Sequence, residues 1–189
     1  MNFQKELSNI KYHEIINELD INAGDIVYIC SDITGLLLNS RKNNENFDPQ
    51  KFIDSIINKV GSNGTVLFPT FNWGFCKNER FDLQKTPSQC GALTNEALKR
   101  KDFERTQHPI YSFSVWGKDK EKLIGMNNKS SWSEDSPFGY LYRNKAKNLF
   151  IGIDYKNGFT MDHYFEQKNN VEYRYHKNFQ GEYVDKQKK

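Results

Sequence analysis

Three mainly apolar runs constrain the fold of this chain more than any other feature. They occupy residues 26–30, 65–71 and 149–153, and each is rich in β-branched or aromatic side chains. A continuous apolar run of this length, bounded by turn residues, is typical of a strand that is buried on both faces. Helical patterns separate the runs, so the sequence predicts a sheet covered by helices, which is an α/β fold.

The clearest helix lies between the first two runs. Asp48 is a predicted N-cap, Pro49 occupies the first helical position and Gly61 follows the end, and the apolar residues between them recur at helical spacing. Further helices are predicted for residues 3–19 (one helix or two short ones), after Gly91, for residues 118–126 and after Ser136. Further predictions are a strand at 112–117, a strand-like run at 171–175, a functional or mobile loop at 72–89 and a disordered loop at 39–46.

Length and composition narrow the class of protein. A chain of 189 residues is long enough for one domain and short for two, so a single domain over residues 1–189 is expected. Lys and Arg number 27 against 24 Asp and Glu, an excess too small to indicate a nucleic-acid-binding protein. No apolar run approaches the ~18 residues of a membrane span. Three cysteines without metal-ligand spacing fit free thiols in a reducing cytoplasm, and no metal site is predicted.

The residues that follow the third run carry the strongest chemical signal. A break at residues 158–159 and a predicted N-cap at Thr160 place Asp162, His163 and Glu166 in the first turns of a helix. Positions three apart share a helix face, so Glu166 is a better candidate than Asp162 to orient the imidazole of His163. This is the arrangement of a general base with its carboxylate. The structural alternative is a capped surface helix that carries one histidine.

Four segments stand in order along the chain, namely residues 24–33, 64–71 with 86–91, 105–113, and 136–138 with 160–166. This ordered set resembles the aminoglycoside 3-N-acetyltransferase family, the antibiotic N-acetyltransferases, over about residues 19–166. The resemblance implies a three-layer α/β/α fold with a central mixed sheet, unrelated to the GNAT fold. It also implies acetyl-CoA-dependent acylation of an amine, usually a sugar amine, by direct transfer in a ternary complex without a metal.

The resemblance assigns roles to individual residues. His163 is expected to be the general base, with Glu166 or Asp162 as its acidic partner, and Thr70 is expected close to the thioester. The residues expected to bind coenzyme A are Ser31, Asp32, Ile33, Thr34, His108 and Ser112. Thr160 matches the threonine that opens the last motif and is expected to contact the acceptor. Independently of the resemblance, aromatic residues such as Trp73, Phe75 or Trp132 are candidates to stack with the base of a nucleotide-linked acceptor.

Two departures from the family pattern leave alternatives open. The coenzyme segment contains Asp32 where the family commonly has serine, and an aspartate repels phosphate unless it is paired or points away. Only 23 residues follow Glu166, whereas members of the family usually continue well beyond this motif, so a short member, a truncated chain and an incomplete acceptor site are all open expectations. The acceptor is a nucleotide-linked amino sugar or an aminoglycoside, and the mildly basic chain slightly favours the former. A coenzyme A-binding protein without turnover is an alternative, as is a hydrolase that uses Cys30 with His108 or His163. Oligomeric state stays open, a homodimer included.

Overall fold

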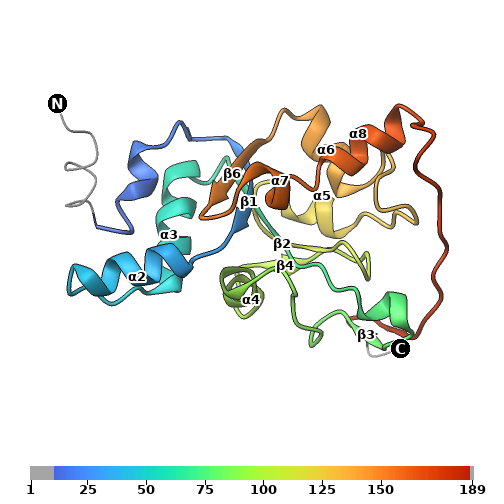
Figure 1. The fold of residues 1–189 in the computed structure, drawn as a ribbon, viewed down its shortest axis with the longest axis horizontal. Helices are drawn as coiled ribbons and strands as arrows, with labels where there is room; N and C mark the ends of the chain where they lie inside the picture. The colour runs from blue at the N-terminus through green and yellow to red at the C-terminus, as the bar shows by residue number, and fades with distance from the viewer. Residues whose placement is uncertain (1–10, 188–189) are drawn as a thin grey trace.

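The computed structural model describes residues 11–187, and a five-stranded mixed sheet forms its centre (Figure 1). The strands of this sheet lie in the order β4-β5-β2-β1-β6. They are β1 (Ile26–Ser31), β2 (Thr65–Pro69), β4 (Glu104–Arg105), β5 (Phe113–Gly117) and β6 (Lys147–Ile151). Strand β1 runs parallel to both β2 and β6, whereas β5 is antiparallel to β2 and β4. The predicted mixed sheet is therefore confirmed.

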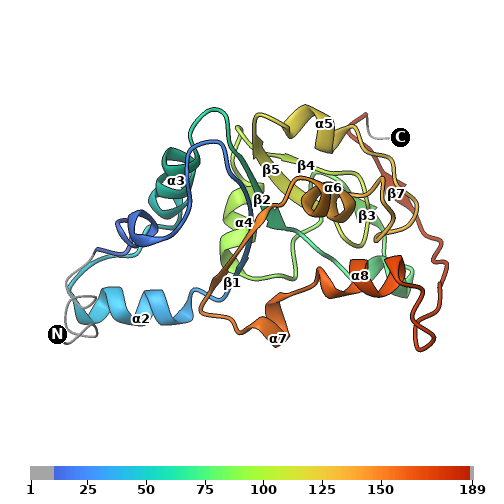
Figure 2. The same ribbon diagram turned by 90° about the horizontal axis from the view of Figure 1, so that it is seen from above.

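Helices cover both faces of the sheet, as Figure 2 shows from above. The α-helices are α2 (Thr34–Lys42), α3 (Pro49–Val60), α4 (Ala92–Leu98), α5 (Lys120–Ile124), α6 (Pro137–Arg143), α7 (Tyr155–Gly158) and α8 (Asp162–Lys168). Val27 and Ile29 of β1 pack in the core beneath α3 and α4, while the alternate residues Tyr28 and Cys30 pack in a second core beneath α5, α6 and α8. The period of two along β1 thus divides its side chains between two apolar layers, and the three-layer prediction is confirmed.

Helix α3 forms as its end signals predict. The Asp48 carboxylate accepts hydrogen bonds from the backbone N–H groups of Gln50 and Lys51, and Gly61 ends the helix with φ 64°. A positive φ is strained for residues with a side chain, which explains the glycine at this position. The buried face consists of Phe52, Ile53, Ile56 and Val60.

Several local predictions are wrong. The third apolar run forms an edge strand, β6, which is partly exposed because it pairs with β1 alone, and the strand begins and ends two residues earlier than predicted. Residues 39–42 belong to α2 rather than to a disordered loop. Residues 171–175 form a turn instead of a strand, since the backbone N–H of Arg174 donates to the Val171 carbonyl.

Two other predicted segments differ in part. Within the N-terminal helical pattern, residues 3–10 lie outside the described part of the chain, and the rest contributes the 3-10 helix η2 (Ile15–Glu18). The long loop after β2 contains a second 3-10 helix, η3 (Gly74–Lys77), and the short strand β3 (Phe81–Asp82).

The sheet topology brings the predicted functional segments to one edge. Parallel strands β1, β2 and β6 end at the same edge, so Ser31, Thr70 and the segment leading to α8 lie along it. Strand β5 is antiparallel to β2 and therefore begins at this edge, next to Ser112. Ligands of open α/β sheets bind at such an edge.

The segment after α8 crosses the molecule. It runs down the right-hand side of Figure 1 and ends in the short strand β7 (Tyr183–Val184), which pairs in parallel with β3. The chain therefore passes close to α8 and then covers the loop that follows β2. Among residues 11–187, no helix has both the length and the apolar character needed to cross a membrane.

Candidate active site

His163 and Glu166 make the contact that their spacing predicts. Nδ1 of His163 lies 2.9 Å from Oε2 of Glu166, one turn further along α8. The helix begins after Met161, which makes no side-chain cap, so the predicted capping role of Thr160 is wrong. Thr160 instead accepts the backbone N–H of His163 through its carbonyl oxygen, at 3.4 Å.

The hydrogen bond with Glu166 fixes the proton on one ring nitrogen. The bond with His163 and, secondly, Arg174 hold the pKa of Glu166 below its usual value, so this carboxylate is ionised and can only accept. A neutral His163 therefore carries its proton on Nδ1 and keeps a lone pair on Nε2, an assignment that follows from the hydrogen-bond network. Nε2 has no hydrogen-bond partner within the described residues. The side chain is 31% exposed, so the lone pair is accessible from solvent.

Asp162 is hydrogen-bonded to the backbone and lies farther from the imidazole ring of His163. One carboxylate oxygen accepts the backbone N–H of His163 at 2.7 Å, and the same oxygen lies 3.4 Å from Nδ1. The side chain is about half exposed. Glu166 is thus the nearer partner of the imidazole, as the helix geometry predicts.

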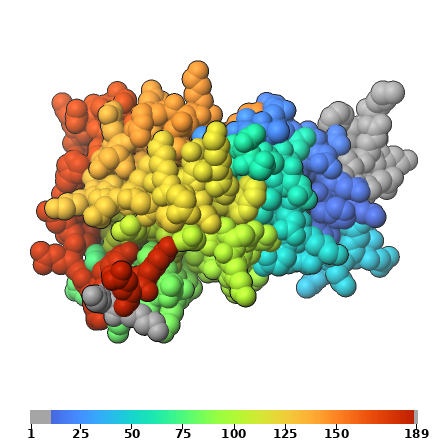
Figure 3. All heavy atoms as spheres, turned by 180° about the vertical axis from the view of Figure 1, so that it is seen from behind, coloured from blue at the N-terminus to red at the C-terminus, as the bar shows by residue number. Residues whose placement is uncertain are grey.

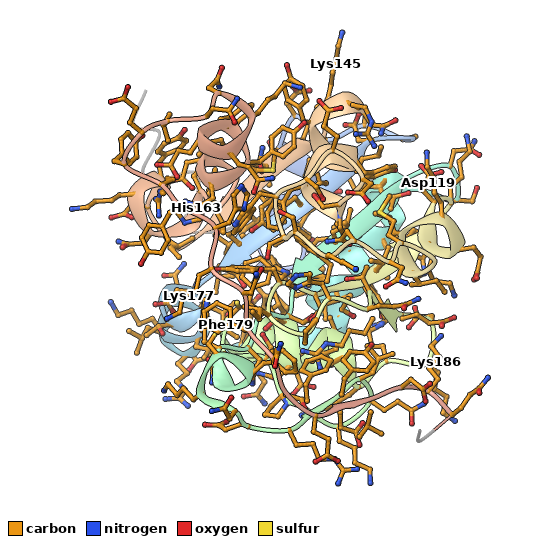
Figure 4. All side chains as sticks on the ribbon, turned by 90° about the vertical axis from the view of Figure 1, so that its right-hand side faces the viewer. Asp119, Lys145, His163, Lys177, Phe179 and Lys186 are labelled. Carbon is orange, nitrogen blue, oxygen red and sulfur yellow. The ribbon has the colours of Figure 1, made fainter. Side chains whose placement is uncertain are left out.

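Two residues that the sequence did not indicate complete this cluster. Nη2 of Arg174 lies 2.8 Å from Glu166 Oε2 and 3.1 Å from His163 Nδ1, and the Tyr173 hydroxyl donates to Glu166 Oε1 at 3.3 Å. Both belong to the irregular segment after α8, which Figure 4 shows passing below His163 toward Lys177 and Phe179. No spacing rule connects an irregular segment with a preceding helix, so sequence reasoning could not find them.

An aromatic wall extends from His163. The ring centroids of Trp132 and His163 are 5.1 Å apart, those of Trp132 and Tyr111 4.5 Å, and those of Tyr111 and Trp73 6.4 Å. Trp73 is 40% exposed at the far end of this wall. Phe75, which was predicted to contact the acceptor, is instead buried in a small separate core beneath the C-terminal segment. Among the predicted aromatic candidates, Trp73 is therefore exposed, Trp132 is half-buried against His163 and Phe75 is buried.

The predicted coenzyme segment lies at the end of β1. The hydroxyl oxygen of Ser31 is buried and lacks a hydrogen-bond partner among the described residues. The exposed Asp32 carboxylate accepts the backbone N–H of Thr34 at 2.9 Å, and hydrogen bonds with Thr34 lower its pKa. The Asp32 N–H donates to Ile151, whereas the N–H of Ile33 has no partner in residues 11–187. The Ile33 side chain packs in the core, so the segment offers one free backbone donor.

Thr70 and Ser112 meet in the interior rather than at the surface. Both are fully buried, and their hydroxyl oxygens are 2.9 Å apart. Arg105, also buried, donates from Nε to the Ser112 hydroxyl at 2.9 Å and from Nη2 to the Thr70 carbonyl at 2.6 Å. A further donation from Nη1 reaches the Thr86 carbonyl. We call Thr70, Ser112 and Arg105 the buried polar cluster.

Burial changes the interpretation of this cluster. It lowers the pKa of Arg105 to about 10. Within the described chain, the hydrogen bonds of this guanidinium go to neutral hydroxyl and carbonyl oxygens and none goes to a carboxylate. A fully buried hydroxyl that is already hydrogen-bonded does not reach a substrate. The predicted contacts of Thr70 with the thioester and of Ser112 with coenzyme A are therefore not supported. These side chains hold β2, β5 and the loop before α4 together.

His108 is also held by the protein itself. Its Nδ1 accepts backbone N–H groups from Ile110 at 3.2 Å and Tyr111 at 3.0 Å, and its Nε2 lies 3.2 Å from the Ser131 hydroxyl. Burial lowers its pKa to about 4, so the ring is neutral at pH 7. Both nitrogens are occupied, which makes His108 a turn residue and does not support its predicted contact with coenzyme A.

The environment of Cys30 argues against a nucleophilic thiol. Its Sγ donates to the Gly158 carbonyl at 3.0 Å, and burial raises its pKa to about 12. The thiol is therefore protonated at neutral pH and unreactive. The hydrolase alternative is not supported. In the part of the chain that the structure describes, no group of three or more His, Cys, Asp or Glu side chains is placed to hold a metal ion.

A hollow of about 370 Å³ lies away from His163. It is lined by residues of the C-terminal end, including Tyr183 and Lys186, together with Arg105 and Glu121. Figure 3 shows the C-terminal end lying over the middle of the chain on this side of the molecule. Neither His163 nor Arg174 contributes to its wall, so this hollow is separate from the candidate base.

The structure is a three-layer α/β protein with a histidine–carboxylate pair at the strand-end edge of its sheet, and comparisons with known proteins identify its family. A sequence profile of the family described as Aminoglycoside 3-N-acetyltransferase matches residues 40–189. The chain belongs to this family. The matched range includes the 160–166 segment but begins after the 24–33 segment.

Individual relatives give the same result. The SPbeta prophage-derived aminoglycoside N(3')-acetyltransferase-like protein YokD of Bacillus subtilis (strain 168) is 36% identical over 126 residues, which cover 54% of this chain and 46% of YokD. The chain thus spans about half the length of this curated relative.

Solved structures share the fold. The crystal structure of YokD superposes with a TM-score of 0.71 at 22% identity, covering 84% of this chain and 69% of YokD. AAC-IIIb in its binary complex with CoASH gives 0.68 at 19% identity, covering 82% and 63% of the two chains. Sisomicin-bound AAC-VIa gives 0.61 at 20% identity, covering 75% and 58%.

Proposed function

We propose that this chain is an acyl-CoA-dependent N-acyltransferase that acetylates the amine of an amino sugar, with His163 as the general base. The observation that carries the proposal is the 2.9 Å contact between His163 Nδ1 and the ionised Glu166, which leaves Nε2 accessible and without a partner among the described residues. Membership of the family supports an amine acceptor, and the CoASH complex of AAC-IIIb supports coenzyme A as the acyl carrier.

The reaction needs a base because an alkylammonium is not a nucleophile. Nε2 of His163 accepts the proton of the acceptor amine as the nitrogen attacks the thioester carbonyl. A C–N bond forms, the C–S bond breaks, and the proton leaves with the released thiol. Glu166 stabilises the imidazolium that forms in this step. The transfer is direct within a ternary complex, and no acyl group is attached to the protein.

The end of β1 fits a coenzyme A-binding role in two respects. The buried Ser31 hydroxyl lacks a partner among residues 11–187, and an unpaired buried polar atom is costly unless a ligand or water satisfies it. The free Ile33 N–H is a candidate donor to the thioester oxygen, where negative charge develops. The Asp32 carboxylate is exposed and ionised, so phosphate groups must bind clear of it. A cytoplasmic location remains a prediction based on three free cysteines.

Thiol release from acetyl-CoA across a panel of amines tests the proposal. The panel includes kanamycin-type aminoglycosides, simple amino sugars and nucleotide-linked amino sugars, with His163→Ala as the control variant. Turnover that disappears in His163→Ala supports the proposal. A stable acetylated protein in the intact mass spectrum, after mixing with acetyl-CoA alone, contradicts direct transfer. Coenzyme A binding without turnover of any amine favours the non-catalytic alternative.

A further inference from the structure

We infer that the acceptor carries a phosphate group in addition to its single amine, and that Arg174 binds this phosphate. The inference rests on the proposed function and narrows its substrate class. It starts from the way in which Arg174 contacts the His163–Glu166 pair.

Arg174 uses one nitrogen for every contact that it makes with this pair. Nη2 donates to Glu166 Oε2 and Oε1 at 2.8 and 3.2 Å. It lies 3.1 Å from His163 Nδ1 because Nδ1 donates to the same Oε2 atom. Nε and Nη1 have no hydrogen-bond partner in residues 11–187, and the side chain is 51% exposed. The guanidinium is thus anchored on one side and presents free N–H groups to solvent beside the base. A planar guanidinium with adjacent free N–H groups is well suited to bind phosphate oxygens.

The carboxylates around α8 argue against an acceptor with many positive charges. Glu166 is paired with Arg174 at 2.8 Å, and Glu134 is paired with Lys168 at 2.8 Å. Asp162 remains about half exposed beside the imidazole, with one oxygen bonded to a backbone N–H. A polycationic acceptor is best held by several unpaired carboxylates. Glu172 and Asp135 are also exposed in this region, but Asp162 is the exposed carboxylate that lies against the imidazole. This carboxylate and the exposed guanidinium of Arg174 match an acceptor with one amine and one anionic group.

The aromatic wall is compatible with a nucleotide-linked form of this acceptor. Trp132 contacts the His163 ring, and the wall continues through Tyr111 to the exposed Trp73. A nucleobase stacks well on an exposed indole. A simple sugar phosphate and a nucleotide-linked sugar both contain a phosphate that Arg174 can bind, so the experiment includes both.

The test compares acceptors that differ in their phosphate. Values of kcat/KM are measured for glucosamine, glucosamine 6-phosphate, a UDP-linked amino sugar and kanamycin, using the wild-type protein, Arg174→Gln and Arg174→Lys. Arg80→Gln is the matched control, because Arg80 is an exposed arginine that pairs with Glu182 at 3.0 Å on the small sheet.

The expected result is a change in preference. Wild type favours a phosphorylated acceptor over glucosamine, Arg174→Gln lowers that ratio by about tenfold, and Arg174→Lys retains part of it. A higher kcat/KM for the UDP-linked sugar than for the sugar phosphate identifies the acceptor as nucleotide-linked. A higher kcat/KM for the sugar phosphate identifies it as a simple sugar phosphate. An equal fall for phosphorylated and neutral acceptors means that Arg174 merely positions Glu166 and overturns the inference. A wild-type preference for kanamycin also overturns it.

A calorimetric measurement of binding tests this inference independently of catalytic turnover. The Kd of glucosamine 6-phosphate is measured without acetyl-CoA for wild type and Arg174→Gln. About tenfold weaker binding in the variant supports the inference even where no acceptor is turned over, a result that would overturn only the acyltransferase. Equal Kd values, or no binding to the wild type, overturn the phosphate site itself.

Discussion

Two clusters, each with an arginine, lie at the same edge of the sheet and differ in almost every other respect. In the α8 cluster, Arg174 is half exposed and pairs with the carboxylate of Glu166, next to an accessible histidine nitrogen. In the buried polar cluster, the buried Arg105 donates to the hydroxyl of Ser112 and to the carbonyl oxygens of Thr70 and Thr86. Access to solvent therefore separates the cluster suited to chemistry from the one suited to holding strands together.

The four ordered segments therefore contain both accessible residues suited to catalysis and buried residues that stabilise the fold. Thr70, Ser112 and His108 belong to the same ordered segments as the base, yet their polar atoms are used within the protein. A hydrogen-bonded group in the interior contributes to stability, and its loss leaves a partner unsatisfied. Substitutions in the two clusters are expected to affect different measurements.

The largest expected effect is on catalysis, at Glu166. Glu166→Gln removes the charge that stabilises the imidazolium and selects the Nδ1–H tautomer, so turnover falls by about 10²-fold or more. Asp162→Asn, the matched control on the same helix, has a smaller effect because Asp162 mainly accepts a backbone N–H. Steady-state thiol release measures both. A larger loss in Asp162→Asn than in Glu166→Gln would contradict the assignment.

The next effect concerns stability at acidic pH, at His108. Its folded pKa of about 4 lies below the unfolded value of 6.5, so the unfolded chain binds the proton first as the pH falls. Stability is full above pH 6.5 and decreases toward pH 4, by about 3 kcal/mol in total. Urea unfolding at several pH values measures this loss.

The control for His108 is a residue that does not titrate. His108→Gln retains an acceptor for the two backbone N–H groups, so its unfolding free energy should depend less on pH in the same window. Parallel pH profiles for the wild type and His108→Gln would exclude His108 as the source.

A moderate effect is expected at Ser112. Ser112→Ala leaves Nε of Arg105 and the Thr70 hydroxyl without a partner in the interior, which costs about 1–3 kcal/mol in unfolding free energy. Urea denaturation measures this cost. Ser62→Ala, at an exposed turn, is the control and should change stability by less than about 0.5 kcal/mol. An equal change in unfolding free energy for the two variants would contradict a stabilising role of the buried polar cluster.

The smallest effect is expected at Cys30. Cys30→Ala should change turnover by less than about threefold, and the native thiol should resist iodoacetamide at pH 7, because its pKa is raised to about 12. Alkylation followed by mass spectrometry measures this. Loss of activity in Cys30→Ala, with His163→Ala unaffected, would instead restore the hydrolase alternative.

Much of the fold could be predicted because its signals are local. The caps of α3 and the apolar runs of β1 and β2 are properties of neighbouring residues, and the structure contains these elements where they were expected. The position of β6 at the sheet edge depends on which strands pair, so its partial exposure could not be derived from its apolar sequence. The loop prediction failed at residues 39–42 for a different reason, since the α2 helix continues through a polar stretch.

The candidate site was likewise predictable only where it depends on neighbouring residues in the sequence. The contact between His163 and Glu166 depends on the geometry of one helical turn, and spacing alone predicts it. Arg174 reaches these residues through an irregular segment, and the burial of Arg105 depends on the packing of distant elements. Neither property has a local sequence signal.

Measuring activity and stability together in two variants tests the central claim most directly. Turnover and unfolding free energy are determined for the wild type, His163→Ala and Thr70→Val. We predict that His163→Ala loses turnover by about 10²-fold or more with little change in stability, while Thr70→Val loses stability and its folded fraction retains turnover. Retained turnover in His163→Ala, with turnover lost in a stable Thr70→Val, would contradict the account and move the chemistry to the interior cluster.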